Sequence, residues 1–425
     1  MSSHIVPREF AYYVSTAWGT GGGPADWSSN GTYCYATEID TTGLGRELVD
    51  NANNRLTLRG FNRKILTRRN ASLSCGFYLH SSPAHAAEAG TASSYHLCPL
   101  LKSALGGQDL GYAIGAASSE AEETDELEID SDPGFVFGDA TFIYDTSAAR
   151  GEFYITQSIA AGPPVTLALD RDLHFVVDPG GADRTYAVID MFIDDTVTSD
   201  HTLTDHTTLW IRTQGQNTED VQTSMGCKPQ LGQITIAAGE PITIPLDVLV
   251  TTHTHETDTF EDFSAVTASG SAPAVPGLAD QTMVKIAAVG SPLVEIDAYG
   301  SITINPGVMY EMSEGPNGWE GNHGFIDKGD DTTVEMMVDF DADWATAFHA
   351  QTAYHLLIQV GVGTDAIGFY FPRVEFSALP NREPAGNITA SKLMMRALKG
   401  TASISGLSAA NARKLNSPMH IYLVA

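Results

Sequence analysis

The stretch GCKPQLGQITIAAGEPITIPLDVLV, residues 226–250, predicts a long β-hairpin. Ala238-Gly239-Glu240-Pro241 supplies the reversal, because Gly and Pro favour turns. Apolar residues alternate with polar ones on both sides of this turn, which is typical of strands with one buried face. They are Ile234 and Ile236 before the turn and Ile242, Ile244, Leu246, Val248 and Val250 after it. Each arm has about ten residues, twice the usual strand length, so the hairpin spans on the order of 30 Å and outgrows the core of a small domain.

The chain is 425 residues long, which is enough for two or three domains and a sizeable buried core. Its four cysteines, Cys34, Cys75, Cys98 and Cys227, lie far apart and form no C-x-x-C pair. No apolar run opens the chain, and none approaches the roughly 18 to 20 apolar residues of a membrane span. We therefore expect a soluble protein, made in the cytoplasm, with reduced thiols, no zinc module and no membrane partner.

The composition is strongly acidic, with 52 Asp and Glu against 23 Lys and Arg and a formal net charge of -29. Proteins that capture nucleic acid need clustered Lys and Arg to neutralise phosphates, and the sequence offers no such cluster beyond Arg63-Lys64 and Arg68-Arg69. The acidic surface fits two interpretations: it keeps the chain soluble, or it lines a passage through which DNA moves without sticking.

Residues 264–282 separate the chain into two halves. This stretch begins SAVTASGSAPAVPGLAD, is rich in Ala, Ser, Gly and Pro without apolar periodicity, and so predicts a linker. Residues 370–398 of the second half repeat the order proline, strand, Pro/Gly turn, strand, which predicts a second hairpin. We expect a first domain at 1–263, with an insertion at about 110–215 that lacks a counterpart, and a second domain at 283–425.

One short helix is predicted in each half. PLLKSALGG, residues 99–107, starts with a proline suited to a first helical turn and stops at two glycines. DFDADWATAFHAQTA, residues 339–353, offers Asp341 as the N-cap. The other periodic segments read as strands, among them residues 72–79, 185–193 and 333–340. The predicted fold class is therefore mainly β, as two sandwich or barrel domains, each with a long hairpin and a short helix.

Residues that carry chemistry are few. His253 and His255 share a face of an extended segment, a geometry that zinc could use, although an exposed polar hairpin end is the simpler explanation. The acidic residues 118–132 lack the spacing of a calcium loop, so a solvated loop and loose calcium binding both fit them. The sequence contains no G-x-S-x-G elbow and no phosphate-binding loop. We expect no enzyme, no catalytic residue, no cofactor and no metal site.

Residues 225–250, MGCKPQLGQITIAAGEPITIPLDVLV, follow LWIRTQGQ and resemble the signature of major tail tube proteins of long-tailed, non-contractile bacteriophages. In that signature a Gly-Cys step enters a strand, a Gly-Glu turn follows, and a second strand completes a hairpin. Residues 369–395, FYFPRVEFSALPNREPAGNITASKLMM, look like a second copy that lacks the Gly-Cys step and has Gly368 at its head. The resemblance implies a fold of two tail-tube-like domains.

The resemblance implies that hairpins of neighbouring copies pair into a closed barrel around a lumen, and that rings stack into a tube. Two domains per chain then imply a homotrimeric ring with a pseudo-sixfold lumen, whereas one tube domain per chain would require a hexamer. Residues 1–27 would form an arm that bridges stacked rings. The candidate inter-subunit residues are Ile234, Ile236, Gly239, Ile242, Ile244, Leu246, Val374, Phe376, Ile388 and Leu393.

The function implied is a structural one, a virion tail conduit for DNA ejection, assembled in the host cytoplasm and joined to other tail proteins. Asp247, Glu375 and Glu383 are candidate lumen acids, which would let DNA pass without specific binding. Two alternatives stay open. Another virion β-protein, such as a baseplate, fibre or capsid decoration protein, would share the composition, and a metal- or calcium-binding enzyme or adhesin would need the histidines or the acidic loop to bind ions.

Overall fold

The computed structural model describes residues 8–15, 32–34, 36–42, 48–49, 65–66, 71–79, 97–110, 125–129, 135–145, 150–160, 165–173, 184–186, 188–194, 206–214, 219–258, 282–319, 322–339, 341, 343–363, 366–385, 388–399 and 414–424. All of the predicted linker except Thr282 therefore lies outside the described residues, as do the glycine-rich residues 19–27 and most of the acidic stretch 118–132. No helix in the described part of the chain is long and apolar enough to span a membrane.

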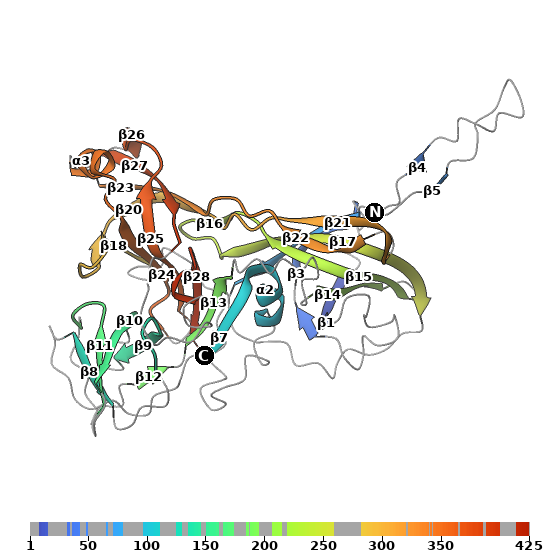
Figure 1. Ribbon diagram of the computed structural model, residues 1–425, viewed down its shortest axis with the longest axis horizontal. Helices are drawn as coiled ribbons and strands as arrows, with labels where there is room; N and C mark the ends of the chain where they lie inside the picture. The colour runs from blue at the N-terminus through green and yellow to red at the C-terminus, as the bar shows by residue number, and fades with distance from the viewer. Residues whose placement is uncertain are drawn as a thin grey trace, which may run out of the picture.

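The fold is mainly β, as predicted, and most described strands belong to one curled antiparallel sheet (Figure 1). Seven strands of the first half form a group that we call the first unit. In spatial order they are β2 (Thr32–Cys34), β1 (Arg8–Ser15), β14 (His206–Gln214), β15 (Glu219–Leu231), β17 (Thr243–Asp258), β6 (Ala71–Tyr78) and β3 (Ala36–Asp40).

Seven strands of the second half form a second unit with the same arrangement. In spatial order they are β19 (Val294–Ile296), β18 (Thr282–Ala288), β24 (Tyr354–Val360), β25 (Ile367–Phe376), β27 (Ile388–Ala397), β23 (Thr333–Asp339) and β20 (Ala298–Asn305). We call two strands counterparts when they hold the same place in the two spatial orders, as β1 and β18 do. Counterparts also come in the same order along the chain in both units. The two units therefore share one topology, an internal duplication at the level of structure.

Smaller elements follow the same plan. Along the chain, a separate hairpin lies between β3 and β6 of the first unit and between β20 and β23 of the second. These hairpins are β4 (Leu48–Val49) with β5 (Ile65–Leu66), and β21 (Tyr310–Trp319) with β22 (Asn322–Asp327). In each unit one helix follows next along the chain: α2 (Cys98–Leu105) after β6 and α3 (Asp343–Ala350) after β23. Both helices were predicted. Gly106 ends α2 with φ +94°, and the Asp341 carboxylate accepts a hydrogen bond from the Asp343 N–H at 2.9 Å, as an N-cap does.

The first hairpin is longer than predicted. Its ladder runs from Glu219 opposite Asp258 to Leu231 opposite Leu246, breaks, and resumes where Thr235 of β16 (Ile234–Ile236) lies opposite Thr243. Gly239 turns the chain with φ +80°, in the predicted place. Both strands are flanked, β15 by β14 and β17 by β6, so much of this hairpin lies inside the sheet of its own unit.

The second hairpin repeats this design. The ladder between β25 and β27 ends at Phe376 opposite Met395, and it resumes where Asn381 of β26 (Asn381–Ala385) lies opposite Lys392. In each hairpin the ladder resumes three residues back along the returning strand, from Leu246 to Thr243 and from Met395 to Lys392. The strand register therefore aligns β17 of the first hairpin with β27 of the second, residue by residue.

The two units are joined at the tip of the first hairpin. β16 pairs with β20 of the second unit, with Ile234 opposite Ile304, Thr235 opposite Thr303 and Ile236 opposite Ile302. Figure 1 shows β16 reaching from the long strands β15 and β17 toward the second unit. A single hydrophobic core contains residues of both units, so the hairpin tip continues the sheet from one unit into the next.

An insertion stands between α2 and β14. It contains β7 (Gly106–Leu110), β8 (Glu126–Ile129), β9 (Ala140–Asp145), β10 (Arg150–Ala160), β11 (Val165–Leu169), β12 (Arg184–Tyr186) and β13 (Val188–Ile193). Strands β8 to β12 form a separate five-stranded sheet, and β13 pairs with the C-terminal strand β28 (His420–Val424). Strands β8 to β13 have no counterpart among the described strands of the second unit and lie within about 110–215, whereas β14, at the end of that range, corresponds to β24.

The N-terminal residues differ from the prediction. Arg8–Ser15 form β1, paired with β14 and β2, and Phe10 and Tyr12 lie in the core. The prediction of a bridging arm is therefore wrong for residues 8–15, because the side chains of Phe10 and Tyr12 pack inside the first unit. Residues 1–7 and 16–31 lie outside the described residues.

Candidate assembly surface

Most of the candidate inter-subunit side chains lie inside the chain's own core. Seven of the ten are buried there: Ile234, Ile236, Ile242, Ile244, Leu246, Val374 and Leu393. Their alternation reflects packing within the two units, which is the ordinary cause of such a pattern. A contact between copies would therefore have to use strand edges and polar faces rather than these apolar side chains.

The other three candidates are at least partly accessible. Gly239 lies exposed at the turn of the first hairpin, and Ile388 is 42% exposed on β27. Phe376 packs with Trp344 of α3 and Tyr354 of β24, with ring centroids 5.8 Å and 5.5 Å away. Phe376 thus fixes α3 against the second hairpin and is only half available to a partner.

The three candidate lumen acids share one face of the sheet. Asp247 lies between the core residues Leu246 and Val248, so its side chain points away from the core. Glu375 lies opposite Arg396, and Glu383 lies opposite Ala390, both on the corresponding side of β27. We call the side of β3, β6, β17, β20, β23, β25, β26 and β27 that is turned away from the core the polar face.

Acidic groups outnumber basic ones on the polar face. Ser74 donates a hydrogen bond to Asp247 at 2.6 Å, and Tyr299 donates one to Asp339 at 2.6 Å, which raises the pKa of Tyr299 to about 12. All the basic groups are paired: Lys392 with Glu335, Arg396 with Asp331 and Arg373 with Glu375. By strand alternation, the acids on this face are Glu38, Asp40, Asp247, Glu335, Asp339, Glu375 and Glu383, and the bases are Arg373, Lys392 and Arg396.

The sequence analysis missed four of these acids: Glu38, Asp40, Glu335 and Asp339. A signal for two of them was present in TVEMMVD, residues 333–339, where Val334, Met336 and Val338 alternate as buried residues and place Glu335 and Asp339 on the opposite side. Strand β3 is too short and too polar to show such a pattern.

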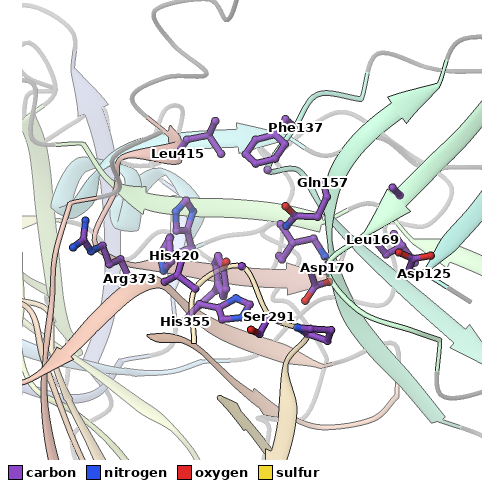
Figure 2. Close-up of a pocket in the computed structure, with 18 of the residues that line it drawn as sticks. Asp125, Phe137, Gln157, Leu169, Asp170, Ser291, His355, Arg373, Leu415 and His420 are labelled. Carbon is purple, nitrogen blue, oxygen red and sulfur yellow. Dashed lines mark hydrogen bonds between the residues drawn. The ribbon is translucent and has the colours of Figure 1, made fainter. Parts of the chain in front are cut away.

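A cavity of about 540 Å³ lies between the inserted sheet and the second unit. Figure 2 shows His355 of β24 and His420 of β28 on one side, with Gln157 of β10 and Asp170 across from them. Burial lowers the pKa of His355, although a hydrogen bond between its Nε2 and the Ser291 carbonyl, at 2.8 Å, opposes that effect. Its neutral form is therefore favoured near neutral pH.

The wall around His420 is a buried charged cluster. His420 Nδ1 lies 2.9 Å from Asp190 Oδ1, and Lys414 Nζ lies 3.5 Å from Asp190 and 2.7 Å from Asp139. Burial alone would raise the pKa of Asp190, but His420 and Lys414 together lower it. Each of these side chains lies beside one of opposite charge, so the cluster holds β13 against β28. The arrangement is that of a structural ion-pair cluster and not of an activated nucleophile.

A second buried cluster fastens the inserted sheet to the second unit. Glu152 of β10 pairs with Lys285 of β18, with Arg171 at 3.5 Å and with Arg150 at 3.1 Å. Nearby, the Gln359 side chain of β24 donates to the Gly151 carbonyl at 2.7 Å and accepts from the Phe153 N–H at 3.1 Å. The insertion belongs to the first half in sequence, yet it is held by residues of the second.

The structure brings together no metal site among the residues it describes. His253 lies on β17, with its Nδ1 3.1 Å from Ser224 Oγ, whereas the side chain of His255 lies outside the described part. The group DKGDD, residues 327–331, uses two carboxylates on its own backbone, since Asp327 accepts from the Gly329 N–H and Asp330 from the Asp331 N–H.

Comparison with known proteins adds no relative. No protein-family model matches the chain, and no curated protein sequence matches it significantly.

Proposed function

We propose that this chain is a structural protein of a bacteriophage tail tube, which assembles into stacked rings around a lumen through which the genome leaves the virion. The observation that carries the proposal is the duplicated unit. Two copies of one seven-strand arrangement, each with a long hairpin and a short helix, are joined side by side through a hairpin tip. A joint of that kind can be repeated from one chain to the next, and a repeated joint closes into a ring when its rotation permits.

The polar face supports a lumen role for the same surface. Its acidic groups, among them Asp247, Glu375 and Glu383, occupy equivalent sheets of the two units. DNA phosphates would be repelled by this face, and each contact avoided is one that need not be broken during transit. The protein's task on this proposal is passive: it shapes a smooth channel and catalyses no reaction.

The duplication also favours three chains per ring. Three chains supply six units and six hairpins, so the lumen would look sixfold while the outside, where only every second unit carries the insertion, would be threefold. Rings would stack along the tail and meet other tail proteins at the two ends. On this proposal the protein belongs to the virion tail and is assembled in the host cytoplasm.

Electron microscopy of the purified protein in negative stain, together with native mass measurement, tests the proposal. We expect rings or tubes with a central hole and a mass of three chains per ring. A protein that stays monomeric over the accessible concentration range would contradict the tube. Six chains per ring would show that only one unit of each chain faces the lumen. Compact particles without a hole would favour a capsid-decoration or baseplate role instead.

A further inference from the structure

The joint between the two units within one chain provides a template for the joint between chains. Within the chain, β16 at the tip of the first hairpin adds to the outer edge of β20, and Thr235 lies opposite Thr303. The duplicated arrangement supplies a second hairpin-tip strand, β26, and a second strand in the place of β20, which is β3. A single chain cannot bring its own β26 and β3 together in this way, because each unit already holds its own position in the sheet.

The equivalent residues can be read from the strand register. Thr235 lies opposite Thr243, and its counterpart Asn381 lies opposite Lys392, at the point where each ladder resumes. Across the sheet, Thr303 lies opposite Glu335, which lies opposite Met394. The same row in the first unit runs from Glu38 to Gly76 to Pro245. Asn381 therefore stands where Thr235 stands, and Glu38 stands where Thr303 stands.

We infer that β26 of one copy pairs antiparallel with β3 of the next copy, with Asn381 of the first chain opposite Glu38 of the second. This inference rests on the proposed function only in that both take the chain to assemble with itself. The partner is a second copy of this chain, and the contact is head to tail: one end of the molecule gives the hairpin tip, and the other end receives it. The polar faces of successive units then join into one continuous surface.

The described residues fit such a contact. Among the described strands, β3 pairs with β6 alone and β26 pairs with β27 alone, so each has one side on which no described strand is placed. Thr37 and Glu38 on β3 and Asn381 on β26 are exposed. Exposed positions on the outer strands of a sheet are where a second chain can add to it. Pro384 within β26 is also typical of an edge, and because it cannot donate a hydrogen bond it confines the new ladder to the residues before it.

The two joints differ in chemistry. The joint within the chain buries Ile234 and Ile236, which are 0% and 3% exposed. Their counterparts in the second hairpin, by the same register, are Pro380 and Arg382. The joint between chains is thus the more polar of the two, so it is weaker and dissociates more readily, and its strength depends on salt.

Disulfide trapping tests the register. The double variant Glu38→Cys with Asn381→Cys should form covalent oligomers under mild oxidation, seen on a non-reducing gel, and each single variant should not. Thr235→Cys with Thr303→Cys is the matched control, because these residues are directly opposite within the chain and should form an intramolecular bond that leaves the chain monomeric on the gel. The unsubstituted protein, treated in the same way, reports any contribution of the four native cysteines.

A charge exchange gives an independent readout. Asn381→Glu would place two carboxylates directly opposite each other across the joint, and like charges there destabilise a strand pair. We expect at least a several-fold rise in the protein concentration needed for rings, and restoration by adding Glu38→Lys. Rings that assemble normally with Asn381→Glu and give no interchain disulfide would overturn this contact while leaving the tube intact. A protein that forms neither rings nor covalent oligomers would overturn both.

Discussion

Gly368 of β25 lies against the ring of Phe153 on β10: a Cβ at Gly368 would meet Phe153 Cδ2 at 3.1 Å and Tyr422 Cβ at 3.3 Å. Phe153 is fully buried and packs edge-on against Phe142, with ring centroids 4.9 Å apart. The contact joins the inserted sheet to the second unit. The glycine at the head of the second hairpin is therefore explained by packing, because it leaves room for the Phe153 side chain of the inserted sheet. Among the described residues, the first hairpin has no such contact to accommodate.

Replacing Gly368 by Ala should destabilise the protein by about 1–3 kcal/mol, since the added methyl group overpacks a rigid interface. Urea unfolding measures the change. Gly329→Ala is the control, because a Cβ added there would meet only Asp327 Oδ1, at 3.4 Å, which is an ordinary van der Waals contact. Adding Phe153→Leu should recover part of the loss. Equal costs at the two glycines would show that the interface yields without resistance.

Lys285 should make stability depend on alkaline pH. Burial lowers its pKa to about 8, with Arg171 adding to the effect and Glu152 opposing it. Below about pH 8 the amine is charged in both the folded and the unfolded chain. Between about pH 8 and the ordinary value of 10.5, the unfolded chain holds the proton and the folded one does not, so the free energy of unfolding rises with pH in this window.

Urea unfolding at pH 7.5 and pH 9.5 checks this prediction. The difference in stability between the wild type and Lys285→Met should move by about 2 kcal/mol in favour of the wild type at the higher pH. Lys328→Met, which removes a half-exposed lysine paired with Glu311, should show no such change. A constant difference at Lys285 would mean that its amine stays charged throughout the range.

Asp190 should make stability depend on acid. Its pKa is held below the ordinary 3.8, because His420 and Lys414 outweigh the effect of burial. The carboxylate therefore stabilises the fold at neutral pH, and this contribution is lost as the pH falls through the lowered pKa. Asp190→Asn should lower the free energy of unfolding by about 3 kcal/mol at pH 7. On acidification to pH 3, the free energy of unfolding should fall less in this variant than in the wild type.

Thermal or urea unfolding at both pH values measures the two effects of Asp190→Asn. Asp172→Asn serves as the control, because Asp172 is exposed on the inserted segment. If the neutral-pH stability of Asp190→Asn equalled that of the control, the cluster would contribute nothing to holding β13 against β28.

The acidic polar face should govern the passage of DNA. Asp247→Lys removes an exposed carboxylate that is held by Ser74 and places a cation on the face. We expect assembly to persist and ejection of DNA from assembled virions to slow, with the defect easing as salt screens the new phosphate contact. Asp172→Lys is the matched reversal away from this face. Equal ejection rates for the two variants would argue against an electrostatic role of the lumen.

Local patterns in the sequence predicted local structure well. Alternation predicted the first hairpin and its turn at Gly239, and the stop at Gly106 and the cap at Asp341 predicted the ends of the two helices. The mainly-β class follows from the same signals, because each depends on neighbours within a few residues. The acids Asp247 and Glu375 could be named in the same way, as polar positions within an apolar alternation.

Remote pairings could not be predicted in this way. Nothing in the sequence of β16 indicates that its edge meets β20, some 70 residues away, and the duplication is visible in strand order far more clearly than in identities. Lys285 stands out as a single charge in TMVKIAA, yet its partner Glu152 is 133 residues distant. Aromatic and glycine content suggested an arm for the N-terminus, whereas Phe10 and Tyr12 pack as core residues because β14 offers them an edge.

The covalent connection between the two units has a kinetic consequence for a ring built as proposed. Because β16 and β20 belong to one chain, their joint forms at the high effective concentration of an intramolecular reaction, and it is already complete when the chain folds. Three of the six joints in a trimeric ring would then cost no encounter between molecules. A ring would then require three molecules to associate instead of six, so rings could still nucleate in a dilute solution of folded chains.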